Sequence, residues 1–171
     1  MITRTLDHQM MLSIWQQHTH AEFVLKDADA ALATMTENPR VLCVPSGAGG
    51  AGREAVRDFY AKAFLPGIPP DFALASVSQI FAQDHIVEEF VISFTHTLNM
   101  DWMLPGILPT GRKTEFPLVG IIRFESGRLA NEHLYWDQAT VLSQLGIVHS
   151  PAAVAGIGSA ARLLERSGRR G

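Results

Sequence analysis

The sequence predicts an α+β fold, in which helices come first and a meander of long strands comes last. Up to about residue 64, apolar residues recur at three- and four-residue spacing, which is typical of amphipathic helices. From Asp71 onward they alternate with polar residues, which is typical of strands with one buried face. A run of helices followed by a run of strands indicates an α+β domain with a mostly antiparallel sheet.

Three helical segments are expected before the strands. Asp7 can cap the first segment. The apolar stripe of that segment comprises Met11, Ile14, Trp15 and His18. The second segment begins at Asp27 and stops at Asn38-Pro39, because a residue that precedes proline is pushed out of the helical region. A short strand at 41–45 then leads to the third helix at 53–64.

Four long strands follow the third helix. They occupy residues 72–83, 86–98, 114–125 and 129–141. The sequence Glu125-Ser126-Gly127-Arg128 is a hairpin signal between the last two strands. Between the second and third strands, a long loop rich in Pro and Gly carries Asp101 and Trp102, and loops of this length are usually functional or mobile.

Length and composition favour one globular domain. The chain has 171 residues, of which 47% are apolar and 18% charged. We expect a single domain at residues 1–150 and an Ala/Gly-rich tail at 151–171, partly flexible, with a short helix around 160–166. The net charge is −3 without a clustered basic face, which argues against nucleic-acid binding. No apolar run approaches the roughly 20 residues of a membrane span, so we expect a cytoplasmic protein.

Four short motifs in order resemble a known family. They are Pro109-Thr110-Gly111-Arg112, then Gly127-Arg128-Leu129, Asp137 ten residues after that glycine, and Gln144-Leu145-Gly146. The segments GREAVRDFYAKAF and PPDF add to the likeness. Over residues 10–147 the chain resembles the SnoaL-like polyketide cyclase family, within the nuclear-transport-factor-two-like superfamily of cystatin-like cones. The resemblance implies helices packed into a strongly curved sheet of four to six strands, which forms a cone with an internal pocket.

The resemblance also implies a chemistry. In characterised members, a pocket aspartate acts as general acid/base with the help of a histidine, without metal or cofactor, and closes a ring by intramolecular aldol chemistry. The matching aspartate is Asp137, and His96 stands near the pocket histidine. His133 replaces a tryptophan that is usual in the family, and the loop before Pro109 is longer. We therefore expect a cyclase, isomerase or hydratase that acts on an apolar, cyclic or polyketide-like carbonyl compound.

The alternation of the last strand gives a partly independent argument. One face carries Asn131, His133, Tyr135 and Asp137, and the other carries Glu132, Leu134 and Trp136. If the first face lines the interior, it offers acid/base groups to a ligand, and an enclosed apolar site raises the pKa of a carboxyl group. Asp137 and His133 are four residues apart, or about 13 Å along a strand, so they cannot form a direct pair. A partner of Asp137 must come from another element, and His96, Asp101 and His18 are candidates.

These arguments define the predicted site. Asp137 is the predicted general acid/base, and His96 or His133 orients it or stabilises an enolate. The predicted substrate contacts are Trp15, Tyr60, Trp102 and Tyr135. Structural alternatives stay open at each position. Asp137 could cap the end of the strand or pair with an arginine such as Arg123, the two histidines could be core residues, and Trp102 could form a lid or a dimer contact.

One glycine motif points to a different class of protein. Residues 47–52 read G-x-G-x-x-G between a strand and a helix, the order of a dinucleotide-binding turn. The second parallel strand that such a site needs is missing, so a flexible turn at the pocket rim is the better interpretation. No HExxH or Cys/His spacing occurs, and we expect neither a metal nor a cofactor.

A competing hypothesis is a small-molecule binding or dimerisation module without catalysis, since one fold serves many functions. An Asp137 that faces an enclosed pocket without a cationic partner would favour catalysis. A buried Asp137 paired with an arginine, and no cavity behind it, would favour the scaffold. We expect a homodimer in either case, because exposed open sheets need cover.

Overall fold

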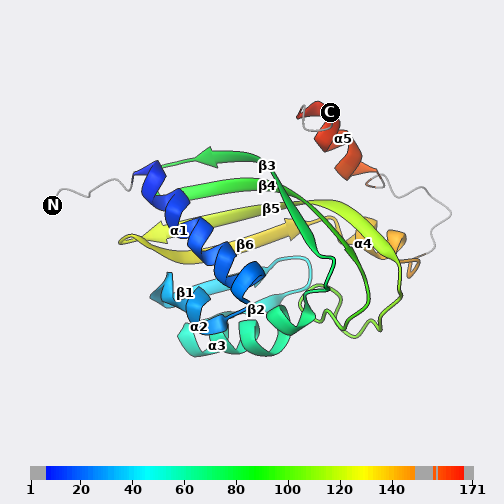
Figure 1. Ribbon diagram of the computed structural model, residues 1–171, viewed down its shortest axis with the longest axis horizontal. Coiled ribbons are helices and arrows are strands. Elements are labelled where there is room, and N and C mark those ends of the chain that lie inside the picture. The colour runs from blue at the N-terminus through cyan, green and yellow to red at the C-terminus, as the bar shows by residue number, and fades with distance from the viewer. Residues whose placement is uncertain (1–6, 149–155, 157, 168–171) are drawn as a thin grey trace.

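The computed structural model describes residues 7–148, 156 and 158–167. Six strands form one curved, unclosed sheet in the order β2-β1-β6-β5-β4-β3, and α1 lies across its concave face (Figure 1). The helical elements are α1 (His8–His20), η1 (Ala21–Leu25), α2 (Ala28–Ala33), α3 (Arg53–Phe59), η2 (Tyr60–Phe64), η3 (Leu65–Gly67), α4 (Gln138–Gln144) and α5 (Ser159–Arg166). The strands are β1 (Met35–Cys43), β2 (Ala48–Ala51), β3 (Ala73–Phe81), β4 (His85–Thr95), β5 (Lys113–Glu125) and β6 (Arg128–Trp136).

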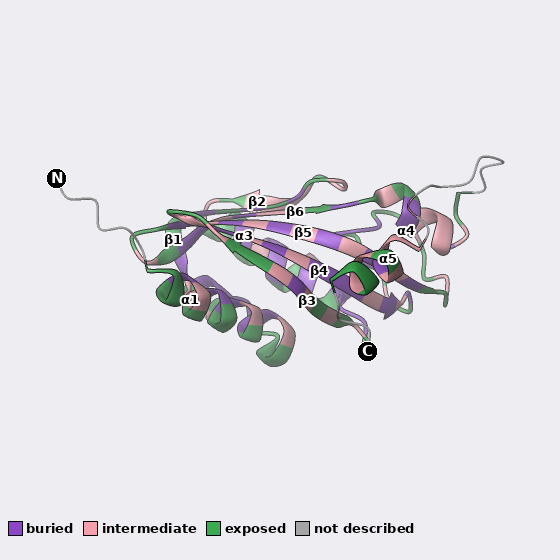
Figure 2. Cartoon of the chain, turned by 90° about the horizontal axis from the view of Figure 1, so that it is seen from above, coloured by how far each residue is buried: buried purple, intermediate pink, exposed green. Residues whose placement is uncertain are grey.

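The α+β class, the six-stranded curved sheet and its mostly antiparallel pairing confirm the predicted fold. Only β1 and β6 pair in parallel within the described sheet. Buried and half-buried residues alternate along β5 (Figure 2), as they do when one face of a strand packs on the core. The concave face therefore carries the core, and α1 closes that face.

The first helix forms where the apolar stripe predicts it. The Asp7 carboxylate accepts a hydrogen bond from the backbone N–H of Gln9 and so caps α1. The chain then tightens into the π-helical turn η1, which ends where Lys26 adopts a left-handed conformation with φ of 51°. Asp27 caps α2 in the same way as Asp7 caps α1. These two caps place α1 and α2 side by side over one end of the sheet (Figure 1).

The predicted extension of the second helix to Asn38 is wrong. Residues 35–39 belong to β1, which lies beside β6 with Met35 opposite Leu129. Pairing with a distant strand outweighs the helical pattern here. The glycine-rich stretch also differs from the predicted flexible turn, because Ala48–Ala51 forms β2, antiparallel to β1. A Cβ atom at Gly49 would collide with the carbonyl oxygen of Val41, so close strand approach accounts for this glycine, and the dinucleotide interpretation finds no support.

The last predicted strand is too long. β6 ends at Trp136, and Asp137 starts α4 instead of continuing the strand to residue 141. The short helix predicted around residues 160–166 is present as α5, whereas residues 151–155, 157 and 168–171 of the predicted tail lie outside the described residues. The apolar side of α5 packs on Val77 and Val91, on the sheet face opposite to the core. None of the described helices is long and apolar enough to cross a membrane.

Candidate active site

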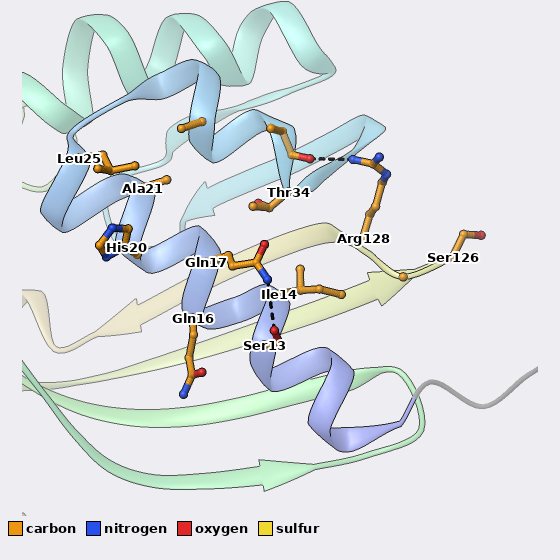
Figure 3. A pocket seen from close by; sticks show the side chains of 13 residues that line it. Ser13, Ile14, Gln16, Gln17, His20, Ala21, Leu25, Thr34, Ser126 and Arg128 are labelled. Atoms are coloured by element: carbon orange, nitrogen blue, oxygen red, sulfur yellow. Dashed lines mark hydrogen bonds between the residues drawn. The ribbon is translucent and has the colours of Figure 1, made fainter.

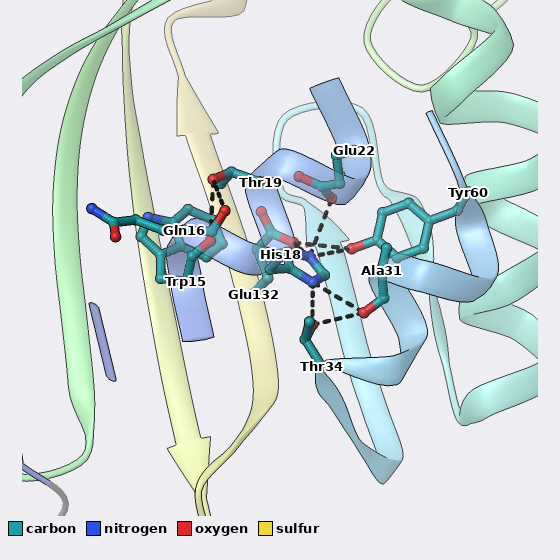
Figure 4. A network of polar contacts seen from close by, with 9 residues as sticks. All are labelled: Trp15, Gln16, His18, Thr19, Glu22, Ala31, Thr34, Tyr60 and Glu132. Carbon is teal, nitrogen blue, oxygen red and sulfur yellow. Dashed lines mark hydrogen bonds and ion pairs between the residues drawn. The ribbon is translucent and has the colours of Figure 1, made fainter. Parts of the chain in front are cut away.

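Four ionisable side chains meet inside the fold, between α1 and the sheet (Figure 4). They are His18 of α1, Glu22 of η1, Tyr60 of η2 and Glu132 of β6, and no more than 4% of any of them is exposed. The Nε2 atom of His18 lies 3.2 Å from a Glu22 oxygen and 3.7 Å from a Glu132 oxygen. Tyr60 links the group, because its hydroxyl lies 3.0 Å from His18 Nε2 and donates to Glu132 at 3.3 Å. We call these four residues the His18 cluster.

The hydrogen-bond partners around His18 fit a ring that carries two protons. On one side, Thr34 Oγ1 lies 2.7 Å from Nδ1 and donates its own proton to the carbonyl oxygen of Ala31. Oγ1 must therefore accept the bond from Nδ1–H. On the other side, the Tyr60 hydroxyl donates to Glu132, so it accepts from Nε2–H. A ring with both N–H groups engaged as donors is an imidazolium cation.

The electrostatics of the cluster agree with this assignment. Burial disfavours a charged His18, but Glu22 and Glu132 outweigh it and raise the pKa of the imidazole to about 10. Burial raises the pKa of Glu22, with a further contribution from the Glu132 charge, and the His18 cation opposes both effects. Burial and the two carboxylates also raise the pKa of Tyr60. The cluster thus combines a fixed cation with a carboxyl group that holds a proton more readily than usual.

A narrow cavity adjoins the cluster. Its water-accessible volume is about 30 Å³, enough for a water molecule. Its lining is largely aromatic and aliphatic, with polar groups supplied by Thr19, Glu22 and Glu132; the other lining residues are Trp15, Phe23, Phe64, Phe72, Leu74, Phe90, Ile92, Trp102, Leu118 and Leu134. Two half-exposed rings, Phe23 and Phe72, stack with their centroids 5.5 Å apart. We take these partly exposed rings as the cavity mouth, which a larger ligand would have to open.

A third buried carboxylate supports the cavity wall. Glu88 of β4 is 2% exposed and accepts a hydrogen bond of 2.6 Å from the indole N–H of Trp15. The Trp15 ring in turn stacks on His18, with centroids 5.8 Å apart and an angle of 18° between the planes. A cation over an indole face is stabilised by the ring quadrupole. Glu88 therefore fixes the ring that covers one side of the imidazolium.

The residues predicted to contact the substrate differ in their position relative to the cavity. Trp15 and Trp102 line the cavity. Trp102 sits on the long loop, buried, with its indole N–H donating to the carbonyl oxygen of Gly67 at 3.3 Å and its ring packed edge-on against Phe64. Tyr60 belongs to the His18 cluster behind the cavity. Tyr135 is 40% exposed and lies away from it.

The predicted orientation of the last strand is wrong. Glu132 and Leu134 line the cavity and Trp136 is buried, so the second face points inward. His133 and Tyr135 therefore lie on the outer face. The neighbours of His133 on the adjacent strands are Leu42 and Ile121. The apolar neighbours of Glu132 decide the orientation, because the face with more apolar surface packs on the core.

Asp137 lies at the exposed end of β6, outside the cavity lining. Its carboxylate accepts hydrogen bonds from the backbone N–H groups of Ala139 and Thr140 and from the Thr140 hydroxyl, the last at 2.6 Å. This geometry is that of a helix N-cap. No hydrogen bond or ion pair among the described residues joins it to His96, to His133 or to Arg123.

His96 is buried at the end of β4, next to the long loop. Its Nδ1 accepts a hydrogen bond of 3.3 Å from the backbone N–H of Thr110, so a neutral ring carries its proton on Nε2. Nε2 has no hydrogen-bond partner among the described residues. Burial lowers the pKa of His96, which keeps the ring neutral.

The His18 cluster is also the place, within the described residues, where a cation could be held. Ligand atoms of His18, Glu22 and Glu132 lie within 4.8 Å of one another, and nitrogen with carboxylate oxygen is a donor set that zinc accepts. In the charged ring, Nε2 carries a proton and lies 3.2 Å from a Glu22 oxygen and 3.7 Å from a Glu132 oxygen. A metal ion would have to displace that proton, which costs affinity near neutral pH.

The sequence reasoning missed Glu22, Glu88 and Glu132 as site residues and named His18 only as a distant candidate partner. A signal for each was present. His18 lies on the apolar stripe of α1, and Glu22 follows four residues later on the same side. Glu88 and Glu132 each occupy an inward position between apolar residues of the same face. A charged residue at a core position of an amphipathic pattern is a sign of a buried polar site.

The comparisons with known proteins agree with the fold. The SnoaL-like polyketide cyclase family matches residues 11–145, and the chain belongs to this family. Among solved structures, TsrD from Streptomyces laurentii is 20% identical, with a TM-score of 0.64 over 84% of this chain and 99% of that one. IdmH from Streptomyces antibioticus, a candidate polyketide cyclase, is also 20% identical, with a TM-score of 0.60 over 81% and 99%.

A third structure covers more of the chain. AclR from Streptomyces galilaeus, a candidate hydroxylase, is 16% identical, with a TM-score of 0.63 over 93% of this chain and 99% of that one. At these identities the likeness is one of fold. No curated protein matches the chain. Family membership therefore supports a polyketide-processing enzyme, and the reaction has to be argued from the site itself.

Proposed function

We propose that the protein is a cofactor-independent acid/base enzyme that acts on an apolar, cyclic or polyketide-like carbonyl compound. The observation that carries the proposal is the position of Glu22 and Glu132. Both residues belong to the lining of a largely apolar cavity, and the carboxyl groups of both lie against the His18 ring. Apolar walls with a few convergent polar groups are typical of small-molecule sites.

The two carboxyl groups have different roles in the proposed reaction, one as general base and the other as general acid. Glu132 takes a proton from the carbon next to the substrate carbonyl, and the electrons of the broken C–H bond form an enolate. Glu22, whose pKa burial raises, carries a proton that it donates to the enolate oxygen. His18 stays protonated and stabilises the negative charge in a water-poor site. In either outcome the enol O–H returns its proton to Glu22 and the carbonyl reforms. Delivery of the Glu132 proton to a different carbon isomerises the substrate, whereas attack of the enol carbon on a second carbonyl, whose oxygen takes the Glu132 proton, closes a ring.

Trp15 and Trp102 would form the apolar walls for the substrate, and the Phe23–Phe72 pair would gate it. The cavity has a volume of about 30 Å³. Pockets for drug-sized ligands are much larger, with volumes of roughly 300 Å³ or more. A ring-sized substrate must therefore part the two phenyl rings. Stacked aromatic pairs contribute only about 0.5–1.5 kcal/mol beyond their buried area, so substrate binding can offset the cost of opening.

Deuterium exchange of a simple probe tests the proposal. 2-Tetralone, an apolar cyclic ketone, exchanges the hydrogens next to its carbonyl in D₂O, which NMR follows directly. We expect the wild type to accelerate this exchange and Glu132→Gln to reduce the acceleration by about 10²–10⁴-fold, the usual contribution of a general base. Asp137→Asn is the matched control, because asparagine also caps helices well, and it should keep the wild-type rate.

Other outcomes decide between the hypotheses. If Asp137→Asn loses the activity while Glu132→Gln keeps it, the acid/base role belongs to Asp137. If the wild type binds 2-tetralone without accelerating its exchange, the non-catalytic binding module on the same fold is favoured. The observation behind this non-catalytic hypothesis is the same cavity, since a cavity of this shape can bind a small molecule without catalysing a reaction.

We also propose that the protein forms a homodimer through the outer face of β1 and β6. Leu42, Val44 and Tyr135 expose 37%, 38% and 40% of their surface on this face, and His133 lies between them. An apolar strip on an open sheet is stabilised by a second copy that covers it. Light scattering after size exclusion measures the mass, and Leu42→Lys should shift a dimer to the monomer. A monomeric wild type at micromolar concentration would end this part of the proposal.

A further inference from the structure

A broad surface groove lies behind the His18 cluster, on the side away from the cavity. It has a volume of about 930 Å³ and runs between α1, α2 and the β5–β6 hairpin (Figure 3). Its lining is mostly polar or small, with Ser13, Gln17 and Arg128 among the exposed side chains. Arg128 donates to the carbonyl oxygen of Ala33 at 2.7 Å and so ties the hairpin to α2 across the groove.

Thr34 belongs to both the groove and the cluster. It is half-exposed and lines the groove, and its hydroxyl lies 2.7 Å from Nδ1 of the fully buried His18 (Figure 4). On the opposite side of the ring, Nε2 lies 3.0 Å from the Tyr60 hydroxyl, which reaches Glu132 at 3.3 Å. Hydrogen bonds therefore run without a gap from Glu132 at the cavity wall, through Tyr60 and His18, to Thr34 in the groove.

We propose that Thr34 is the proton exchange point of the cluster, which connects the enclosed site with water in the open groove. In one exchange the Nδ1–H bond of His18 breaks and its proton passes to Thr34 Oγ1. At the same time the hydroxyl proton of Thr34 leaves Ala31 and passes to a water molecule, which becomes hydronium. The ring is left neutral with its remaining proton on Nε2, and the reverse sequence restores the imidazolium.

The small size of the cavity gives this route its purpose. The cavity holds about one water molecule, and a substrate that fills it during turnover displaces that water. An acid/base site still has to return to its starting protonation state after each cycle. The path through Thr34 restores this state by moving protons between His18 and water in the groove, without opening the cavity mouth. This consequence rests on the proposed function, whereas the exchange route itself rests only on the hydrogen-bond geometry.

NMR of protein labelled with ¹⁵N-histidine tests the route without any substrate. The exchange rate of the His18 Nδ1–H with water is measured at pH 7, and His18→Gln assigns the signal. We expect Thr34→Val, which removes the hydroxyl but keeps the shape, to slow this exchange by about tenfold or more. Thr34→Ser, which keeps the hydroxyl, should stay within about twofold of the wild type.

Two further variants keep the test decisive. Thr19→Val removes a hydroxyl on the cavity side that bonds only to backbone carbonyls, and it should leave the exchange unchanged. If Thr34→Val does not fold, Ala33→Trp takes its place in the test. This variant places a bulky ring in the groove beside Thr34, keeps the hydroxyl, and should slow the exchange. Wild-type exchange in Thr34→Val, or equal slowing by Thr19→Val, overturns the proposal. A Glu132→Gln variant that keeps its activity on 2-tetralone would remove the proposed function and leave this result untouched.

Discussion

The charge of His18 makes the stability of the fold depend on pH, with a size that follows from the site. The ordinary pKa of 6.5 applies to the unfolded chain, whereas in the folded protein burial opposes the charge but Glu22 and Glu132 outweigh it and raise the pKa to about 10. Because the folded pKa is the higher one, this stabilisation is complete below pH 6.5 and is lost as the pH rises through about 10.

Between pH 6.5 and 8.5 the folded His18 stays protonated while the unfolded one loses its proton. The linkage relation then gives a fall of about 2 kcal/mol in the free energy of unfolding across this window. The raised pKa of Glu22 adds a loss of the same sign above pH 4.5, so the figure is the share of His18 alone. Burial raises the pKa of the Cys43 thiol in the folded protein. In the unfolded chain a free thiol begins to titrate near pH 8.5, so above that pH Cys43 would add its own pH dependence, and the window stops there.

Urea denaturation at pH 6.5, 7.5 and 8.5, followed by tryptophan fluorescence, measures the effect. His18→Gln should flatten the pH dependence by about 2 kcal/mol relative to the wild type. It should also lower the stability at pH 6.5 by roughly 3–5 kcal/mol, because it leaves buried carboxylates without their cation. The control is His20→Gln, an exposed position on the same helix, which should behave as the wild type does. Equal pH dependence in the wild type and in His18→Gln would refute the charged ring.

Three further predictions follow from single contacts. Phe72→Ala removes one ring of the pair at the cavity mouth and should speed the binding of an anilinonaphthalene dye in stopped-flow fluorescence, whereas Leu108→Ala, 77% exposed, should not; equal rates would contradict the gate. Asp137→Ala should cost about 1 kcal/mol in urea denaturation and Asp137→Asn only a few tenths; equal losses would contradict the cap. EDTA or added Zn²⁺ at pH 7 should shift the thermal midpoint by no more than about 1 °C, since the His18 proton occupies the cation position; a shift of several degrees would overturn that assignment.

The fold class was predictable because local patterns carry it. The apolar stripe of α1 and the alternation in β3, β4 and β5 each extend over at least nine residues, and patterns of that length leave little choice of element. The β5–β6 hairpin was predictable from its turn, where Ser126 and Gly127 both adopt positive φ. Each of these features depends on neighbours in sequence.

The failures involve partners far apart in sequence. Met35 extends β1 only because β6 lies beside it with Leu129 opposite, and no local rule reveals a parallel pairing of that kind. The length of β6 was overestimated for a related reason. Asp137 can end a strand or start a helix, and the Thr140 side chain, whose hydroxyl bonds to it, settles the choice for α4.

The candidate site was harder to predict than the fold, because the chemically suggestive residues of β6 lie on its outer face or at its end. His133, Tyr135 and Asp137 are close in sequence and rich in functional groups, yet they share the outer side or the end of β6. Glu132 stands between them and looks like a solvated carboxylate. It is in fact buried beside His18, which reaches it from a helix at the other end of the chain.

The buried charges of the cluster argue for a function beyond stability. Replacing a buried ion pair with well-packed apolar residues is often neutral or stabilising by about 1–4 kcal/mol, and Met11 and Ala31 show that apolar side chains fit this part of the core. Stability alone therefore does not account for Glu22 and Glu132 in the core. Their joint position at a cavity wall, with a cation behind them and a hydrogen-bonded path to a groove, is what an acid/base site requires. The hydrogen bonds that Asp137 makes within the described residues are those of a helix cap, so the proposed chemistry is to be sought first at Glu132.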